Sequence, residues 1–129
     1  MADFMLDATV FADYRAGDPS AKAIIERVIA GESTASISSA TVFELWGSAW
    51  FDRRLEIGIV GMLRFVEEAP ITIEAAKLAG AWMQGTTDQD DPRLPIIALV
   101  AATAKTRGEP VITRQDDTFA RFYTEIISY

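Results

Sequence analysis

Near its start the chain reads Phe4-Met5-Leu6-Asp7-Ala8-Thr9-Val10-Phe11, an apolar run that passes through one acid into a helical pattern. The segment Asp3–Leu6 is typical of a short buried strand, and residues 8–14 repeat apolar positions at helical spacing. Asp7 is therefore expected at the carboxyl end of a strand, directly before a helix. Open parallel α/β sheets bind their ligands at this position.

The same alternation of short strands and helices continues to the end of the chain. We predict strands over residues 34–38, 70–73, 110–113 and 125–128, and helices over residues 20–30, 40–54, 57–67, 74–83, 96–106 and 118–123. Asp18 is expected to be the N-cap of the first of these helices, with Pro19 at its first position, and Gly108 is expected to end the helix over residues 96–106. Parallel strands need helical crossovers, so this order predicts a mostly parallel sheet covered on both faces. We expect an α/β fold, a three-layer α/β/α arrangement, formed by residues 1–129 as one domain.

Composition excludes several kinds of active site. The 129 residues include no cysteine and no histidine, which removes disulfides, thiolate sites, Ser-His-Asp triads and Cys-His pairs. Any catalysis must use carboxylates, hydroxyls, lysine or a hard metal ion. The net charge of −7 also argues against binding nucleic acid through bulk electrostatic attraction.

Nothing in the sequence predicts a membrane protein. The longest apolar stretch, Leu94–Ala104, is much shorter than the roughly 20 residues that a spanning helix needs. The first ten residues carry Asp3 and Asp7 where a signal peptide would carry basic residues. We therefore expect a cytoplasmic protein.

Acidic side chains follow three of the predicted strands. They are Asp7, Glu44 on the helix after the second strand, and Asp116 with Asp117 after the strand that ends at Thr113. Carboxylates that gather at one sheet edge without basic neighbours repel one another, and Mg²⁺ or Mn²⁺ is their natural counter-charge. Such an ion polarises phosphate and activates water, so it would allow a phosphodiester to be hydrolysed without histidine.

Each of these acids also has a purely structural interpretation. Asp7 suits the N-cap of the helix that follows it, and Glu44 suits an ordinary exposed helix position. Asp116 and Asp117 are typical of a turn or of a helix start. The acidic run 88–91 is most simply a solvated loop.

Aromatic and basic residues outside the acids leave two interpretations open. Trp46, Trp50 and Phe51 on the predicted Glu44 helix, with Trp82 further on, suit either the core or a dimer or partner groove. Two arginines, at positions 114 and 121, could meet phosphate near the site or could be ordinary surface charges.

Four segments of the chain together resemble a known family. They are Phe4–Phe11, Ile37–Leu45, Ala98–Ala104 and Pro110–Arg114, in that order and spacing. The sequence resembles a PIN domain across nearly its whole length, with the greatest likeness to the VapC-type toxins of bacterial toxin–antitoxin pairs. The resemblance implies a PIN-like three-layer fold and a Mg²⁺-dependent endoribonuclease.

The resemblance also assigns residues to the site. Asp7 and Glu44 match two of the acids that bind the metal ion in that family, and Thr9 and Thr113 match hydroxyl positions that support the site. Asp116 or Asp117 would be a helper at a shifted position.

Two further acids of the family pattern are missing. Ile97 stands where the third acid belongs, and Thr118 stands at the fourth position, where its hydroxyl would be a supporting group. Gln115 replaces the usual Asn or Asp after the Thr-Arg pair. Because an aliphatic side chain cannot bind a hard cation, we expect nuclease activity to be weakened.

The resemblance further implies an antitoxin partner, an RNA substrate and a homodimer. The alternative is a catalytically inactive PIN-fold module that binds RNA or a partner protein. The sequence leaves both open.

Overall fold

The computed structural model describes residues 2–86 and 91–129. Strands and helices alternate through this part of the chain. In order they are β1 (Phe4–Leu6), α1 (Ala8–Arg15), α2 (Pro19–Ile29), β2 (Ala35–Ser38), α3 (Ser39–Trp46), α4 (Arg53–Met62), β3 (Val66–Ala69), α5 (Ile73–Gln84), α6 (Leu94–Arg107), β4 (Val111–Ile112), α7 (Asp116–Phe119) and β5 (Ile126–Ile127).

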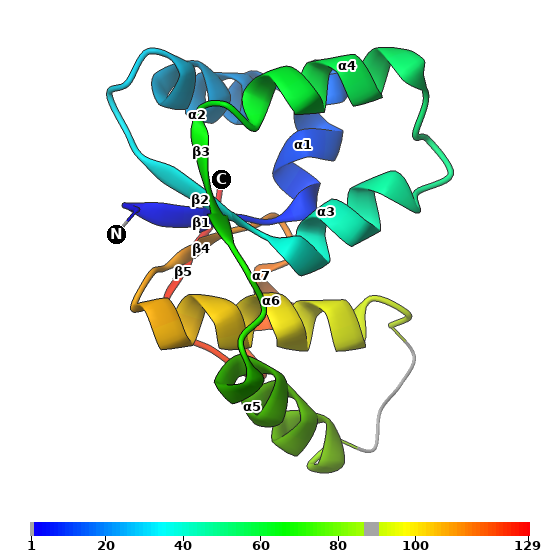
Figure 1. Cartoon of the computed structure of the whole chain (residues 1–129), viewed down its shortest axis with the longest axis vertical. Coiled ribbons are helices and arrows are strands. Elements are labelled where there is room, and N and C mark those ends of the chain that lie inside the picture. Colours follow the sequence, from blue (N-terminus) through cyan, green and yellow to red (C-terminus); the bar gives the residue numbers. More distant parts are fainter. Residues whose placement is uncertain (1, 87–90) are drawn as a thin grey trace.

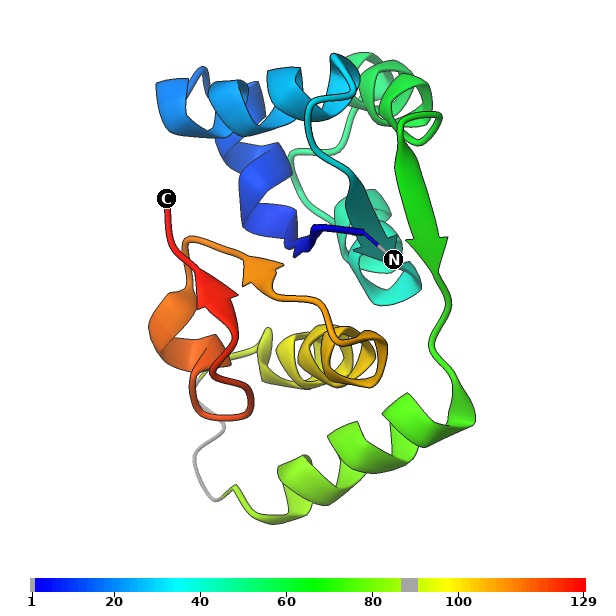
Figure 2. The same cartoon turned by 90° about the vertical axis from the view of Figure 1, so that its left-hand side faces the viewer.

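The strands form one sheet in the order β3-β2-β1-β4-β5, and every neighbouring pair is parallel. The first strand of the chain is therefore the central one, with Met5 paired to Ser36 on one side and to Val111 on the other. Helices α1, α2 and α4 cover one face, and α6 with α5 outside it covers the other (Figures 1 and 2). The predicted three-layer α/β/α fold is confirmed.

Several predicted helix ends are confirmed by their capping groups. The side chain of Asp18 accepts a hydrogen bond from the backbone of Ala21, and Pro19 occupies the first turn of α2. Gly108 ends α6 in the left-handed conformation, with φ +70°, which a residue without a Cβ adopts at little cost.

The predicted helix over residues 40–54 is wrong in extent. Helix α3 ends at Trp46, where Gly47 is the C-cap, and the chain restarts only when Asp52 caps α4. Asp52 accepts a hydrogen bond from the backbone of Leu55 at 2.8 Å. The two predicted helices, over residues 40–54 and 57–67, are therefore both present, but the break between them lies at residues 47–52, between the C-cap Gly47 and the N-cap Asp52.

The third strand also lies earlier than predicted. Residues 66–69 form β3 beside β2, whereas the sequence indicated a helix to residue 67 and a strand over 70–73. This is an edge strand with two exposed glutamates, so it lacks the apolar run that identifies a strand. Thr72 instead caps α5, accepting a hydrogen bond from Ala75 at 3.1 Å.

Helix α6 is part of the hydrophobic core. Eight of its fourteen residues are buried, which explains why its apolar residues occur on nearly every side. Among the helices of the described residues, none is long and apolar enough to cross a membrane.

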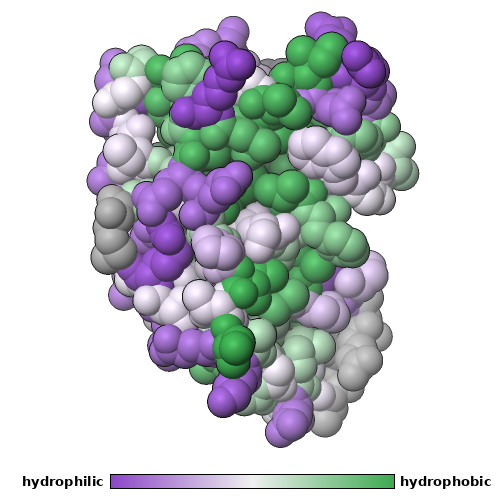
Figure 3. Space-filling model, viewed as in Figure 1, coloured by the Kyte–Doolittle hydropathy of each residue, from purple (hydrophilic) through white to green (hydrophobic). Residues whose placement is uncertain are grey.

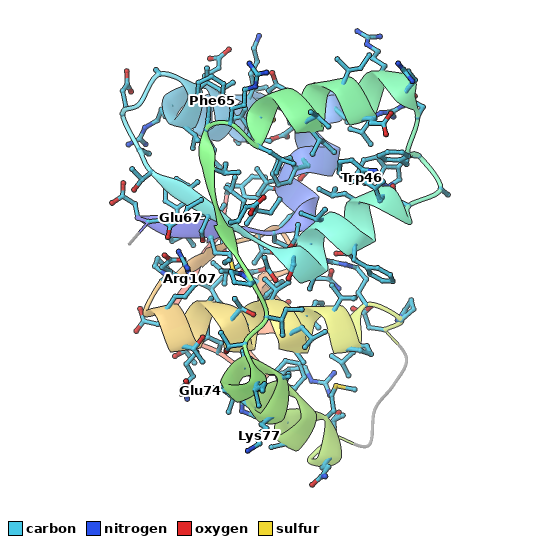
Figure 4. The ribbon with its side chains drawn as sticks, in the orientation of Figure 1. Trp46, Phe65, Glu67, Glu74, Lys77 and Arg107 are labelled. Atoms are coloured by element: carbon cyan, nitrogen blue, oxygen red, sulfur yellow. The ribbon has the colours of Figure 1, made fainter. Side chains whose placement is uncertain are left out.

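A buried carboxylate joins the strands at the end of the sheet opposite to Asp7. Glu109 accepts hydrogen bonds from Ser36 Oγ at 2.6 Å and from the backbone of Ala2 at 3.0 Å. Arg107 pairs with Glu109 and reaches Glu67 on the edge strand at 2.7 Å (Figure 4). This cluster links β3, β2 and the approaches to β1 and β4.

Candidate functional site

The candidate site lies at the carboxyl ends of the central strands. Asp7 follows β1 directly, Thr113 follows β4, and Glu44 lies on α3, which begins where β2 ends. The Asp7 side chain is fully buried, and the Glu44 side chain is 19% exposed. The topology therefore brings these sequence-predicted residues to one place.

Asp7 is held by two hydroxyl groups. Its Oδ2 accepts hydrogen bonds from Thr9 Oγ1 at 2.9 Å and from Thr113 Oγ1 at 2.8 Å. The backbone N–H of Thr9 also points to Oδ2, at 3.4 Å, so Asp7 is the N-cap of α1. The structural and functional interpretations of this acid hold together, because one oxygen caps the helix while the other faces the site.

Sequence reasoning missed the residue that joins the two acids. The Arg93 guanidinium donates from Nη2 to Asp7 Oδ1 at 2.9 Å, from Nε to Glu44 Oε2 at 2.5 Å and from Nη2 to Glu44 Oε1 at 2.9 Å. The acids were expected to gather without a basic neighbour, and this expectation is wrong. The available signal was an arginine one helical turn before Ile97, at the N-cap of the helix that crosses the site.

Arg93 belongs to a closed ring of polar contacts. Its backbone N–H donates to Asp91 Oδ1 at 2.8 Å, and its Nη1 donates to the side-chain oxygen of Gln115. The amide nitrogen of Gln115 donates in turn to Asp91 and, at 3.3 Å, to Thr118 Oγ1. Asp91 therefore has site partners and is more than a solvated loop residue.

The electrostatics of the site keep Arg93 charged. Burial alone would lower the pKa of its guanidinium, but the hydrogen bond to Glu44 and the charge of Asp7 outweigh burial and raise that pKa above its ordinary value. The side chain is 22% exposed, so its charge is only partly hydrated. The acid pair therefore carries its own counter-charge at any pH at which the protein is folded.

The remaining candidate acids lie apart from this cluster. Asp116 accepts a hydrogen bond from Ser128 Oγ at 2.8 Å, and Asp117 is exposed in the first turn of α7. Within residues 2–86 and 91–129, no hydrogen bond joins either of them to Asp7 or Glu44. Residues 88–90 of the predicted acidic loop lie outside the described residues.

The other side chains singled out in the sequence have identifiable surroundings. Arg114 pairs with Asp13 at 2.5 Å and with Asp18 at 3.3 Å, while Arg121 donates to Thr86 at 2.9 Å. The aromatic residues mostly pack inward: Trp46 and Trp50 lie against the core, Trp46 is 5.0 Å from the Phe51 ring, and Trp82 is stacked on Phe122.

A divalent metal ion does not fit the acid pair in this arrangement. Both oxygens of Asp7 and both oxygens of Glu44 already accept hydrogen bonds, three of the four from Arg93. In the part of the chain that the structure describes, no three acidic side chains are grouped so that they could hold a metal ion. The buried position of Ile97 adds no ligand, because its side chain belongs to the core beside Met5 and Val100.

A separate groove lies between α1, α2 and α4. Phe11, Ile29, Ile59 and Phe65 contribute apolar surface to it. Its basic residues are Arg15, Lys22, Arg54 and Arg64, against a single acid, Asp52. Figure 3 shows hydrophobic side chains among hydrophilic ones over this end of the molecule.

Comparison with solved structures extends these findings. A chain of the DNA-bound VapBC structure from Salmonella typhimurium has 25% identity and a TM-score of 0.75, covering 99% of this chain and 98% of that one. A chain of a toxin–antitoxin complex from Klebsiella pneumoniae has 22% identity and a TM-score of 0.73, covering 96% and 95%. A chain of VapBC2 from Rickettsia felis, bound to a promoter DNA fragment, has 16% identity and a TM-score of 0.73, covering 98% of each.

No curated protein is significantly similar to the sequence. The PIN domain family model, however, matches residues 4–125, from the first strand almost to the last. The matched range contains Asp7, Glu44, Arg93 and Thr113, and thus the whole candidate site. The chain belongs to the PIN domain family.

Proposed function

We propose that this protein is a VapC-like toxin of a toxin–antitoxin pair, and that it is an endoribonuclease of weakened activity. Its PIN-domain membership and its likeness to chains of toxin–antitoxin structures, over more than nine-tenths of their length, support the proposal. In this proposal residues 1–129 act as one PIN-like domain.

The observation that carries the proposal is the convergence of Asp7, Glu44, Thr9 and Thr113 at the carboxyl ends of β1, β2 and β4. Four polar side chains from three distant parts of the chain meet there, with Asp7 fully buried. A buried carboxylate is costly to keep for the fold alone, since a helix cap needs only a surface acid. We therefore infer that the pair serves the family's reaction on RNA.

The activity is weak in this proposal because the site lacks what the family requires. PIN nucleases generally use a divalent metal ion, and the Mg²⁺ or Mn²⁺ that the resemblance implies does not fit beside Arg93. We assign no catalytic step to a metal ion for this reason. Asp116, Asp117 and Thr118 enter the proposal only as neighbours of the site.

An RNA cleavage assay tests this proposal. Purified wild-type protein should cleave single-stranded RNA slowly, and Asp7→Asn should abolish the cleavage. Glu26→Gln is the matched control, because it neutralises an exposed acid on α2 away from the site. Cleavage that survives Asp7→Asn at the wild-type rate would contradict a nuclease site at this position.

We place the antitoxin in the groove between α1, α2 and α4. The apolar floor and the basic residues of this groove suit an amphipathic segment with acidic flanks. Ile29 and Phe65 line this groove, and their side chains are exposed at 42% and 50%. Replacing Phe65 with Glu should weaken antitoxin binding and change the melting temperature little, because this lining side chain is half exposed.

A homodimer is a further part of the proposal. The Phe43 side chain on α3, next to Glu44, is 71% exposed, and an aromatic surface of this kind is typical of protein contacts. Sedimentation of wild type and of Phe43→Ser measures this directly: only the wild type should dimerise.

The second candidate is a catalytically inactive PIN-fold module that binds RNA or a partner protein. The contacts of Arg93 with both acids favour it, because a guanidinium already lies between the two carboxylates. The same RNA assay separates the two candidates. The inactive module predicts no cleavage above background and an antitoxin complex that is unaffected by Asp7→Ala.

A further inference from the structure

The two site acids have all their oxygens occupied. Arg93 donates to Asp7 Oδ1 and to both oxygens of Glu44, while hydroxyl groups occupy Asp7 Oδ2. The contact with Glu44 is bidentate, so the guanidinium plane is fixed against this carboxylate. The guanidinium thus fills the place between the acids in which a shared cation would lie.

The arginine is also held from its own side. Its backbone donates to Asp91 at 2.8 Å, and its third nitrogen donates to Gln115, which in turn contacts Asp91. Because both ends of the residue are fixed, the clamp is part of the fold and is more than a surface ion pair. Its partners come from β1, α3 and the segment after β4.

Charge explains what this arrangement excludes. Two carboxylates and one guanidinium leave a net charge of −1, and Asp7 has no contact with bulk water. A divalent cation that entered would lie a few ångströms from a fixed positive charge in a poorly hydrated site, where like charges repel strongly. It would also have to break the bidentate contact with Glu44.

We propose that Arg93 is the permanent counter-ion of the Asp7 and Glu44 carboxylates, and that it excludes a divalent cation from this site until its guanidinium is displaced. The Arg93 guanidinium takes the position that a divalent metal ion from solution would otherwise occupy. Position 97, where the family resemblance places an acid, is apolar in this chain, and Arg93 brings a positive charge to the two acids from one turn earlier. This inference deepens the proposed function, since it concerns the same acid pair.

Titration of Mn²⁺ by calorimetry tests the proposal without RNA. Wild type should give no saturable heat at millimolar Mn²⁺. Arg93→Gln should give saturable heat, with an affinity for Mn²⁺ at least about tenfold above any weak binding by wild type. Adding Asp7→Asn to Arg93→Gln should remove that binding. Arg114→Gln is the matched control, since this exposed arginine pairs with Asp13 and Asp18 and should leave the wild-type result unchanged.

Thermal unfolding provides the second readout. Arg93→Gln leaves two acids unpaired, so it should melt earlier than wild type, and Mn²⁺ should restore its melting temperature while NaCl of equal ionic strength should not. Saturable Mn²⁺ binding by wild type, or an Arg93→Gln variant that responds to Mn²⁺ no more than to NaCl, would overturn the proposal. Neither result depends on RNA cleavage, so the inference and the proposed nuclease fail separately.

Discussion

The backbone N–H of Ile97 donates to the carbonyl oxygen of Arg93 at 2.9 Å, so these residues stand one turn apart on the same side of α6. Ile97 is fully buried in the core, while the Arg93 side chain reaches Asp7 and Glu44. The position at which the family resemblance places an acid is apolar here, and the adjoining turn brings a positive charge into the site.

This relationship predicts that an acid placed at position 97, with no other change, will destabilise the folded protein. Ile97→Asp should lower the free energy of unfolding by about 3 kcal/mol, because a carboxylate would replace an aliphatic side chain in the core. Ile97→Val is the control and should cost only about 1 kcal/mol. Urea denaturation measures both, and an Ile97→Asp variant as stable as Ile97→Val would show that the position is open to the site.

The hydroxyl of Thr113 predicts a local loss of stability. Thr113→Val removes the donor to Asp7 Oδ2 and the acceptor for the Gln115 backbone, so it should lower the free energy of unfolding by about 2 kcal/mol. Thr124→Val, at an exposed position, should change it little. Equal effects of the two substitutions would mean that Asp7 finds another donor.

The Glu109 cluster, far from the site, predicts a larger loss of stability than Thr113→Val. Glu109→Gln leaves Arg107 without its buried partner, and breaking such a pair costs about 3 kcal/mol. Glu67→Gln removes only the exposed partner of Arg107 and should have a much smaller effect. Denaturation midpoints of the two variants should therefore separate clearly, and a larger loss in Glu67→Gln would contradict this assignment.

The C-terminal tyrosine predicts a loss of stability at alkaline pH. Burial and a hydrogen bond to Asp13 raise the pKa of Tyr129 above its ordinary value of 10.0. A raised pKa means that the folded protein holds this proton more tightly than the unfolded chain. The stabilisation is complete below about pH 10 and is lost as pH rises toward the folded-state pKa.

Wild type should thus lose stability more steeply than Tyr129→Phe above about pH 10. Tyrosinate absorbance, titrated alongside urea denaturation, measures the two effects together. Tyr123, whose pKa burial also raises, keeps some alkaline dependence in the variant. Identical slopes for wild type and variant would show that Tyr129 ionises with the fold intact.

Much of the fold could be predicted from sequence because its signals are local. Asp7, Asp18 and Gly108 mark helix ends through their own side chains or backbone freedom, and the structure confirms each. Edge strand β3 could not be found in this way. Its sequence, Val66-Glu67-Glu68-Ala69, is defined by pairing with β2 and not by an apolar pattern.

The candidate site was predictable only in part, for a related reason. The strand-end rule places Asp7, and the helix after the second strand places Glu44, since topology alone determines both. The spacing of Arg93 from Ile97 is visible in the sequence, but its role is not, because that role depends on the direction of one long side chain across the sheet edge. The same holds for Asp91, which reaches the site through Gln115.

The position of β1 in the middle of the sheet has a consequence for synthesis. The central strand is made first, but Asp7 meets Arg93 only 86 residues later and Thr113 only 106 residues later. Contacts of such long sequence separation form late. A nascent chain on the ribosome therefore cannot assemble this site until Thr113, directly after β4, has emerged, and a chain that stops before β4 never presents it.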